Sequence, residues 1–464
     1  MKKLLLAGVA TLIAAAPAWA ADLPRRAPAL QAAPAVGYDW NGFYVGGYYG
    51  GVVGNQKGST PTSFAGQTNV NQLGFTAGGT LGYNWQIAPT WLIGFEGDFG
   101  YLGINRTNTE FNDFALVGLK TDWYATARGR VGFVTGPSLI YATGGAAFVH
   151  MRDTFGGGLI AAGPTTFTHT NTGWTVGGGI ETKLSRSWTA KTEYLFIDGG
   201  TTNFGSNPYG VSTGATFEHN FHVVKTGLNY KLGEPFWEGL PLFGTSTHLP
   251  SNHNWGGFYA GVNVGGGMSL VHVVGGGVFS PNTNADINGS GFAGGGQVGY
   301  NFMNLFNLLG SSWFAGLEGD VGALRIRASY NDWNDLGARL TENTDWYATA
   351  RGRIGTTTGP ALLYVTAGGA WVHFTDGFSA TSAFNPGDLS ARTAGGWTFG
   401  GGTEVAIDSR WSAKLESLYI DVGHRNHMSA PVGGFVGDFK ERFQVVRAGL
   451  NYKFGVDDVV GARY

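Results

Sequence analysis

From Asp122 to Phe133 the chain reads DWYATARGRVGF, a segment whose pattern recurs along the sequence. Read with the period of two that a β-strand has, it separates two kinds of side chain. One face suits hydrocarbon and the other suits water. The two faces are Trp123, Ala125, Ala127, Val131 and Phe133 against Tyr124, Thr126, Arg128 and Arg130. The first nine residues return letter for letter from Asp345 to Arg353, so the predicted strand belongs to a unit that occurs twice.

Composition excludes several classes of protein. The chain has 464 residues, of which 80 are glycine, more than twice the roughly 7% of an average protein, without the Gly-X-Y period of collagen. Aromatic residues make up 14%, which argues against disorder. The formal net charge of -2 offers no basic surface for nucleic acid, so no nucleic-acid partner is expected. Without cysteine there is no disulfide, thiolate metal site or catalytic thiol.

The N-terminus has the features of a secretion signal. Lys2 and Lys3 precede an apolar run from Leu4 to Ala16, and Ala18-Trp19-Ala20 matches a cleavage site. We therefore expect a signal peptide over residues 1–20 and a flexible Ala/Pro-rich lead-in over 21–39; the alternative is a short membrane anchor. No later stretch supplies the ~18 apolar residues of a membrane helix, so a membrane-spanning form must be a closed sheet.

Eight alternating segments follow in the first unit. Their approximate spans are 42–55, 72–87, 91–105, 122–134, 138–152, 170–184, 188–200 and 217–232. Each exceeds the roughly 9–11 residues of a tilted membrane strand. Long connections (56–71, 106–121, 153–169, 201–216) alternate with the tight turns at 88–90, 135–137 and 185–187. Short turns at one end and long loops at the other are typical of an outer-membrane barrel.

The second unit repeats the plan. Trp255 to Tyr259 echoes Trp40 to Tyr44, and the closing Gly449 to Lys453 repeats Gly227 to Lys231 letter for letter. The sequence therefore predicts an all-β protein of two tandem units, each a transmembrane antiparallel up-and-down β-barrel of eight strands. The expected bounds are 40–232 for the first barrel, 233–254 for a periplasmic linker, 255–455 for the second barrel and 456–464 for a C-terminal tail. One sixteen-stranded barrel is the alternative.

Side-chain size decides which face points outward. Between Gly74 and Ile87 one face carries the bulky side chains and the other carries mainly glycine, threonine and asparagine. The interior of an eight-stranded barrel is just wide enough for side chains to fill, so the face with the smaller side chains points inward and the bulky face meets lipid; the alternative is an extracellular soluble β-protein. Tryptophans near strand ends fit interface girdles: Trp85, Trp91, Trp123, Trp174, Trp188, Trp346, Trp397 and Trp411.

Charged residues fall on the inward positions of both units. In the first unit they are Glu96, Asp98, Glu181 and Glu193 with Arg128, Arg130, Lys183, Lys191 and Lys225. In the second they are Glu318, Asp320, Glu404 and Glu416 with Arg351, Arg353, Lys414 and Arg447. Nearly balanced charges in a narrow lumen should pair, because an unpaired buried charge costs several kcal/mol. We therefore expect a plug rather than a pore, with an acid/base site or ion path as the alternative.

Other features give no chemical site. His150 and His373 are equivalent in the two units, but neither has metal-ligand spacing with another histidine. The stretch 282–289 has one carboxylate and no closing glutamate, so it is expected to be a solvated turn rather than a calcium loop. The triple glycines at 177–179 and 400–402 are not followed by a helix and so are not phosphate cradles. We expect no catalytic residue, cofactor or metal.

The last predicted strand, Val445 to Phe454, has the alternation of a terminal barrel strand. It looks like the signature by which outer-membrane barrels are passed to the barrel-assembly machinery. Since the chain continues to Tyr464, either Phe454 or Tyr464 would be the recognised aromatic residue, and a plain last strand is the alternative.

Several motifs together resemble one family. They are Ala-Asp-Leu-Pro after the signal, Trp-x-Gly-Phe-Tyr opening each unit, the Asp-Trp-Tyr-Ala-Thr-Ala-Arg-Gly-Arg strand, Gly-Trp-Thr, and the ending Gly-Leu-Asn-Tyr-Lys-Phe. In combination they resemble the outer-membrane β-barrel surface antigens of alphaproteobacteria, also called outer-membrane immunogenic or porin-like proteins. The resemblance covers nearly the whole mature chain. Members typically form one eight-stranded barrel, so the duplication departs from the family plan.

Three functions remain open. The favoured one is a non-enzymatic protein of the cell outer membrane, with lipid, lipopolysaccharide and host or neighbouring-cell ligands as partners of its surface. A sixteen-stranded barrel would instead enclose a water channel and act as a diffusion porin. An outer-membrane enzyme would need a Ser/His or Asp/His constellation near the outer rim, and no such cluster repeats in the sequence.

Overall fold

The computed structural model describes residues 38–59, 67–110, 115–156, 165–204, 215–236, 253–277, 280–308, 311–331, 339–357, 360–379, 388–428 and 436–455. The predicted signal peptide, nearly all of the lead-in and most of the linker lie outside the described residues, as does the C-terminal tail. Among the described residues, none forms a helix of the length and apolar character needed to cross a membrane.

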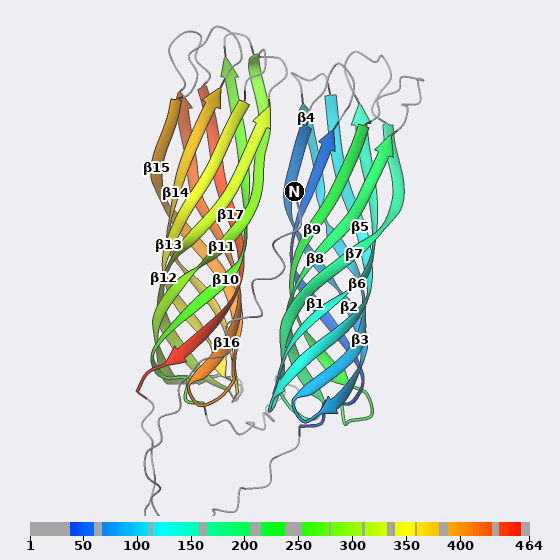
Figure 1. Ribbon diagram of the computed structural model, residues 1–464, viewed down its shortest axis with the longest axis vertical. Helices are drawn as coiled ribbons and strands as arrows, with labels where there is room; N and C mark the ends of the chain where they lie inside the picture. Colours follow the sequence, from blue (N-terminus) through cyan, green and yellow to red (C-terminus); the bar gives the residue numbers. More distant parts are fainter. Residues whose placement is uncertain are drawn as a thin grey trace, which may run out of the picture. The chain divides into compact units, whose positions relative to one another are not determined.

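The first unit is a closed antiparallel barrel (Figure 1). Its strands are β1 (Gly42–Ser59), β2 (Gln67–Ala88), β3 (Trp91–Gly103), β4 (Asn105–Glu110), β5 (Ala115–Thr135), β6 (Ser138–Gly156), β7 (Thr165–Lys183), β8 (Trp188–Phe204) and β9 (Ala215–Lys231). β3 and β4 both pair with β5 and are interrupted only at Ile104, so they act as one strand of the barrel. The described residues of this unit therefore form eight barrel positions, which pairing of β1 with β9 closes.

The second unit is also a closed antiparallel barrel within the described residues. Its strands are β10 (Gly257–Gly277), β11 (Ser280–Leu308), β12 (Ser311–Asn331), β13 (Arg339–Thr357), β14 (Ala361–Ser379), β15 (Asp388–Ala406), β16 (Trp411–Met428) and β17 (Val436–Lys453). β10 pairs with β17, with Tyr259 opposite Lys453, just as Tyr44 lies opposite Lys231 in the first unit. Each unit closes on itself, so the prediction of two barrels is confirmed and the sixteen-stranded alternative is wrong.

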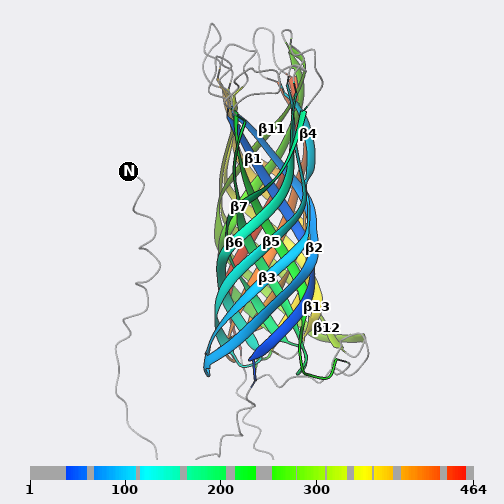
Figure 2. The same ribbon diagram turned by 90° about the vertical axis from the view of Figure 1, so that its right-hand side faces the viewer.

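The short turns lie where the sequence predicts them, but the strands run further at the opposite end. Pro89 and Thr90 join β2 to β3, and residues 184–187 join β7 to β8. By contrast, most of the predicted loop 56–71 is strand, since β1 and β2 stay paired out to Ser59 opposite Gln67. Stretch 282–289, expected to be a turn, likewise lies within β11 and pairs with β10. Figure 2 shows the long, oblique course of the strands. We call the end of each barrel that carries these short turns the short-turn end. The opposite end is the long-loop end.

Inward and outward faces alternate as side-chain size predicts. Along β3 exposed and buried residues alternate almost without a break. Phe95 is 75% exposed, whereas the neighbouring Glu96 is 3% exposed. Bulky apolar groups therefore cover the outer wall of this strand, and polar groups face the lumen.

The lumen nevertheless holds more than small and charged side chains. Towards the long-loop end, bulky apolar residues also fill the lumen. The prediction that small and charged side chains point inward is therefore incomplete. In the first barrel this apolar layer is Tyr48, Val52, Leu102, Ile104, Leu119, Tyr124, Ala147, Val149, Met151, Leu195, Ile197, Phe221 and Val223. In the second it is Ala293, Leu324, Ile326, Tyr347, Ala370, Val372, Phe374, Ala394, Leu418, Ile420, Val422, Phe443 and Val445.

Candidate functional site

A network of buried charges lies in the lumen of the first barrel. Period-two alternation puts neighbouring inward residues of one strand two positions apart, and the closed sheet brings such pairs from different strands together. β3 contributes two carboxylates and β5 two guanidinium groups, while β7, β8 and β9 supply the rest. The members, each at most 4% exposed, are Glu96, Asp98, Arg128, Arg130, Glu181, Lys191, Glu193 and Lys225.

Arg128 is the centre of this network. Its Nη1 donates to Glu193 Oε1 at 2.8 Å, and its Nη2 donates to Asp98 Oδ2 at 2.7 Å and to Glu96 Oε1 at 2.5 Å. Lys225 Nζ reaches Asp98 Oδ2 at 2.5 Å and Glu193 Oε2 at 3.0 Å. Charge-assisted hydrogen bonds of this kind are roughly twice as strong as neutral ones. The trio Glu96, Asp98 and Glu193 is compact enough for a metal ion, but it is already paired with the bases Arg128, Lys191 and Lys225.

Arg130 extends the network towards the short-turn end. Its Nη1 lies 3.0 Å from Glu181 Oε2 and 3.3 Å from Glu96 Oε2, and its Nη2 donates to Asn84 Oδ1 at 2.6 Å. Lys191 Nζ donates to Glu96 Oε2 at 2.8 Å. The network therefore continues without a break from Asp98 to Glu181.

A glycine makes room for one further member. Tyr44 donates its hydroxyl to Glu96 Oε2 at 2.6 Å, although the two residues lie on β1 and β3 with β2 between them. To do so the tyrosine ring crosses over Gly82, where an added Cβ would overlap the Tyr44 hydroxyl. Any larger residue at position 82 would therefore displace this bond.

The second barrel repeats the centre of the network. Arg351 Nη1 donates to Glu416 Oε1 at 3.0 Å, and its Nη2 donates to Asp320 Oδ2 at 2.8 Å and to Glu318 Oε1. Arg447 stands in the place of the lysine and donates to Glu416 Oε2 at 2.6 Å and to Asp320 Oδ1 at 2.9 Å. The same charge pattern thus occurs in both lumens.

The remaining members follow the first barrel as well. Arg353 reaches Glu318 at 3.1 Å and Glu404 at 3.3 Å, and Lys414 Nζ lies 3.0 Å from Glu318 Oε1. Lys183 differs, because its counterpart in the second barrel is an alanine. Its Nζ lies 4.9 Å from the centre of the Trp40 ring at the short-turn end. Within these networks, four carboxylates meet four bases in each barrel.

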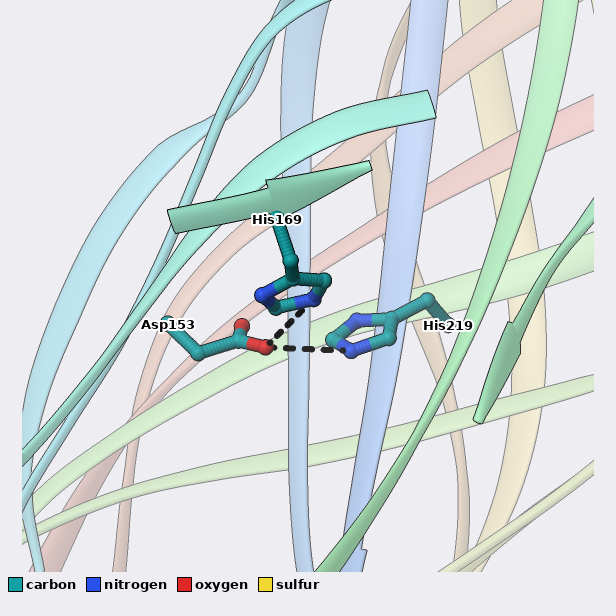
Figure 3. Close-up of side chains that lie close together, drawn as sticks. All are labelled: Asp153, His169 and His219. Carbon is teal, nitrogen blue, oxygen red and sulfur yellow. Dashed lines mark ion pairs between the residues drawn. The ribbon is translucent and has the colours of Figure 1, made fainter. Parts of the chain in front are cut away.

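A second cluster lies in the first lumen, nearer the long-loop end. Asp153 of β6, His169 of β7 and His219 of β9 converge there (Figure 3). Both imidazole Nε2 atoms lie 3.4 Å from the same oxygen, Asp153 Oδ2. Sequence reasoning missed this cluster because each residue comes from a different strand, so no local spacing marks it. The register of the closed barrel brings the three together.

This cluster does not have the geometry of a catalytic triad. Thr202 Oγ1 lies 2.9 Å from His169 Nε2, the same nitrogen that faces Asp153. In a triad, the carboxylate and the nucleophile bond opposite nitrogens of one imidazole. Here both face one nitrogen, so Thr202, His169 and Asp153 cannot form such a relay.

His150 and His373 lie outside both lumen clusters. His150 stacks on Trp123 with ring centres 5.4 Å apart and pairs with Thr170 at 2.9 Å. His373 repeats both contacts in the second barrel, with Trp346 at 5.7 Å and Thr393 at 3.0 Å.

The tryptophans expected at the interfaces mostly lie on the outer wall. Trp123 is half-buried, and the exposed ones are Trp85, Trp91, Trp174, Trp346, Trp397 and Trp411. Trp188 is buried instead, because it packs against Tyr230 and Phe236 and donates its indole N–H to the Phe236 carbonyl at 2.9 Å. Their role as interface girdles stays a prediction.

At the end of β17, Phe454 is half exposed and packs edge-on against Tyr452, with ring centres 5.3 Å apart. Tyr464 lies outside the described residues. The assembly role of either aromatic residue therefore stays a prediction.

Comparison with known proteins also finds one domain twice along the chain. The family model described as outer membrane protein beta-barrel domain matches twice, over residues 7–231 and 240–461. The 31 kDa outer-membrane immunogenic protein of Brucella melitensis is 33% identical over 250 residues, covering 50% of this chain and 100% of that protein. The 22 kDa outer membrane protein of Rhizobium leguminosarum is 31% identical over 197 residues, covering 41% and 78%. Each relative thus corresponds to about half of this chain, as a tandem duplication requires.

Solved structures match more loosely. Ail, the attachment invasion locus protein of Yersinia pestis, has 10% identity and a TM-score of 0.23, covering 41% of this chain and 99% of that chain. The surface protein NspA of Neisseria has 14% identity and a TM-score of 0.24. Matches this loose carry no argument about function.

Proposed function

Because this chain belongs to the outer membrane β-barrel protein family, we propose that it is a non-enzymatic envelope protein whose two closed barrels anchor contact surfaces in the cell outer membrane. The barrels would span the bilayer and stabilise the envelope, while their long-loop ends contact partners outside the cell. Its relative in Brucella is named an immunogenic outer-membrane protein, which supports surface exposure.

The ion-pair network across the lumen is the observation that carries the proposal. Arg128, Glu193, Asp98 and Lys225 bond across the first lumen at distances of 2.5–3.0 Å, and the apolar layer lies beyond them. A solute passing through would have to separate buried ion pairs, and each broken pair costs about 3–5 kcal/mol. The arrangement supports a structural barrel over a diffusion porin.

The outer wall and the long-loop end fit different partners. Exposed Leu81, Phe95 and Phe99 suit the acyl chains of lipid. Beyond the apolar band the strands continue as polar hairpins, which suit contact with lipopolysaccharide and with ligands on host or neighbouring cells. The terminal strand, with Phe454 or Tyr464, would be read by the barrel-assembly machinery.

An enzymatic role has less support. The cluster of Asp153, His169 and His219 lies where an outer-rim active site would be expected, but the shared nitrogen of His169 rules out a nucleophile–base–acid relay.

Conductance of the purified chain in planar bilayers tests the proposal. We expect no stable open steps of porin size when folding has been verified by heat-dependent mobility on gels. Arg128→Ala combined with Glu193→Ala removes one cross-lumen pair and serves as a comparison. Stable large steps from the unaltered chain would contradict the proposal and favour a diffusion porin.

A further inference from the structure

The cluster at the long-loop end of the first lumen has the geometry of a metal site. We propose that Asp153, His169 and His219 bind a divalent transition-metal ion, with Zn²⁺ as its reference ligand. Figure 3 shows both imidazole rings directed at one carboxylate oxygen. The three ligand atoms lie within 4.8 Å of one another.

The distances suit a tetrahedral ion. Bond lengths of about 2.0–2.2 Å to imidazole nitrogen and carboxylate oxygen put neighbouring ligand atoms about 3.3–3.5 Å apart. Both Nε2 atoms are 3.4 Å from Asp153 Oδ2, which is longer than an ordinary N–H···O hydrogen bond. Each imidazole nitrogen is therefore spaced from the carboxylate oxygen as a fellow ligand of one ion rather than as a hydrogen-bonded partner.

Three buried polar atoms of the cluster have no hydrogen-bond partner among the described residues. His219 is fully buried and Asp153 is 2% exposed. Within the described residues, neither nitrogen of His219 nor Asp153 Oδ2 has a hydrogen-bond partner. Buried polar groups are almost always bonded, so an ion held between them would account for these unsatisfied atoms.

The surroundings orient the ligands. Gln56 Nε2 donates to Asp153 Oδ1 at 3.1 Å, which holds the carboxylate with its other oxygen towards the histidines. The His169 ring also has a hydrogen bond with the backbone of Phe167. Such outer contacts fix the orientation of metal-binding side chains. The hydroxyl of Thr202, now 2.9 Å from His169 Nε2, turns away when the ion takes that nitrogen.

The ligand types define the class of ion. Two imidazoles and one carboxylate suit zinc, copper or nickel, whereas magnesium and calcium prefer oxygen ligands alone. Three protein ligands leave a fourth position for water or a further ligand.

The position of the site sets the direction of entry. Along β9, Lys225 belongs to the charge network, Phe221 and Val223 to the apolar layer, and His219 to the cluster. The apolar layer thus separates the cluster from the network below. Because His169 is 21% exposed, an ion would enter from the long-loop end, which faces the exterior in outer-membrane barrels.

The second barrel provides a natural contrast. Register puts His169 opposite Met151 and Arg392 opposite Phe374, at equivalent positions of β7 and β15. His219 lies opposite Gln56, as Glu441 lies opposite Val271. Arg392 Nη2 and Glu441 Oε1 form an ion pair at 2.9 Å where the first barrel has two imidazoles. The proposed site therefore belongs to the first barrel.

Zinc titration of the full chain tests the proposal. The protein is refolded in detergent without a polyhistidine tag, treated with EDTA, and titrated with Zn²⁺ in a calorimeter. We expect one saturable ion per chain, and visible absorption bands of a four-coordinate ion when Co²⁺ replaces Zn²⁺. Gln56→Ala, which removes an orienting contact, should weaken binding about 10–100-fold.

Variants separate the ligands from the other histidines. His219→Ala should abolish saturable binding, and so should His169→Ala, whose partly exposed position makes it the safer variant for folding. His150→Ala is the matched control and should bind as the unaltered chain does. Absence of saturable binding by the folded chain, or equal binding by His169→Ala, would overturn the proposal. Since conductance is measured separately, failure here leaves the envelope role untouched.

Discussion

Arg128 and Glu193 form an ion pair across the lumen of the first barrel, with Arg128 Nη1 2.8 Å from Glu193 Oε1, although β5 and β8 are not neighbours in the sheet. Arg351 and Glu416 repeat the pair in the second barrel at 3.0 Å. Backbone hydrogen bonds join only adjacent strands. These side chains instead connect strands on different sides of the lumen. The lumen charges therefore link strands that are not neighbours in each barrel.

Loss of one carboxylate from this network should destabilise the first barrel. Glu193→Ala leaves Arg128 and Lys225 short of a buried counter-charge, so we expect a cost of about 3–5 kcal/mol in the free energy of unfolding. Urea unfolding in detergent micelles, followed by tryptophan fluorescence, measures it. Glu218→Ala, at an exposed carboxylate of β9, is the control and should change stability by less than about 0.5 kcal/mol. Equal effects of the two variants would contradict the structural role.

A charge on the outer wall should hinder insertion. Phe95 is 75% exposed on the wall of β3, and an arginine facing the middle of the bilayer costs about 2–4 kcal/mol. Phe95→Arg should therefore lower the folded fraction in lipid vesicles, which gel mobility without heating reports, while Phe95→Leu should fold normally. Unhindered folding of Phe95→Arg would mean that this face does not meet lipid.

One ion pair outside the membrane should give a small acid-dependent stability. Asp39 Oδ2 lies 2.7 Å from Lys231 Nζ before β1 begins. Partial burial opposes ionisation, but the bonds from Lys231 and Asn41 lower the pKa of Asp39 from 3.8 to about 2. A lowered pKa stabilises the folded state above pH 4, and this contribution is lost as the pH falls towards 2.

The effect of Asp39→Asn should follow that pH range. The Asp39 side chain is 60% exposed, so solvent screening keeps the contribution below about 1 kcal/mol. We expect Asp39→Asn to lower stability by that amount at pH 7 and by nothing below pH 2, in unfolding curves across pH. A loss that persists at pH 2 would exclude the ion pair as its cause. The second barrel has Asn254 at the equivalent position, so this pH dependence belongs to the first barrel.

The membrane part of the fold was predictable because lipid and lumen demand opposite side chains. Glu96 and Asp98 lie two residues apart, between Phe95 and Phe99. The sequence alone therefore identifies the inward face of β3. The outer ends were not predictable in this way. From Gln67 to Asn71 the sequence shows no strict alternation of apolar and polar residues, although β2 stays paired with β1 there.

The cross-lumen contacts needed the structure. Alternation places Asp153 and His219 on inward faces, but only the closed register shows that they lie at one level. The apolar layer was missed for a related reason. Phe221 and Val223 are bulky, and the expectation of small inward groups came from a segment nearer the other end of the barrel.

Each barrel should fold without the other. Residues 38–236 and 253–455 each contain every strand of one closed barrel, with β1 paired to β9 and β10 to β17. We expect either half, refolded alone in detergent, to show heat-dependent gel mobility and cooperative unfolding. An equimolar mixture of the halves is the control and should behave as the sum. Halves that fold only when mixed would contradict two separate barrels.

Lys225 and Tyr48 should be energetically coupled. Lys225 Nζ lies 4.3 Å from the centre of the Tyr48 ring. The second barrel has Arg447 and Asn263 at these two positions, as the register of β1 with β9 and of β10 with β17 shows. There the longer guanidinium also reaches Asp320 Oδ1, whereas the matching Asp98 Oδ1 has no partner among the described residues.

The exchange of the two residues tests this coupling. Lys225→Arg alone should crowd the Tyr48 ring and cost about 1–3 kcal/mol. Tyr48→Asn alone should cost stability too, because it leaves a cavity in the apolar layer. The double variant should be more stable than the sum of the single changes predicts, by at least about 1 kcal/mol, because the guanidinium then has room to reach both oxygens of Asp98. A double-mutant cycle of urea unfolding measures this difference, and additive changes would show that each barrel tolerates either residue independently.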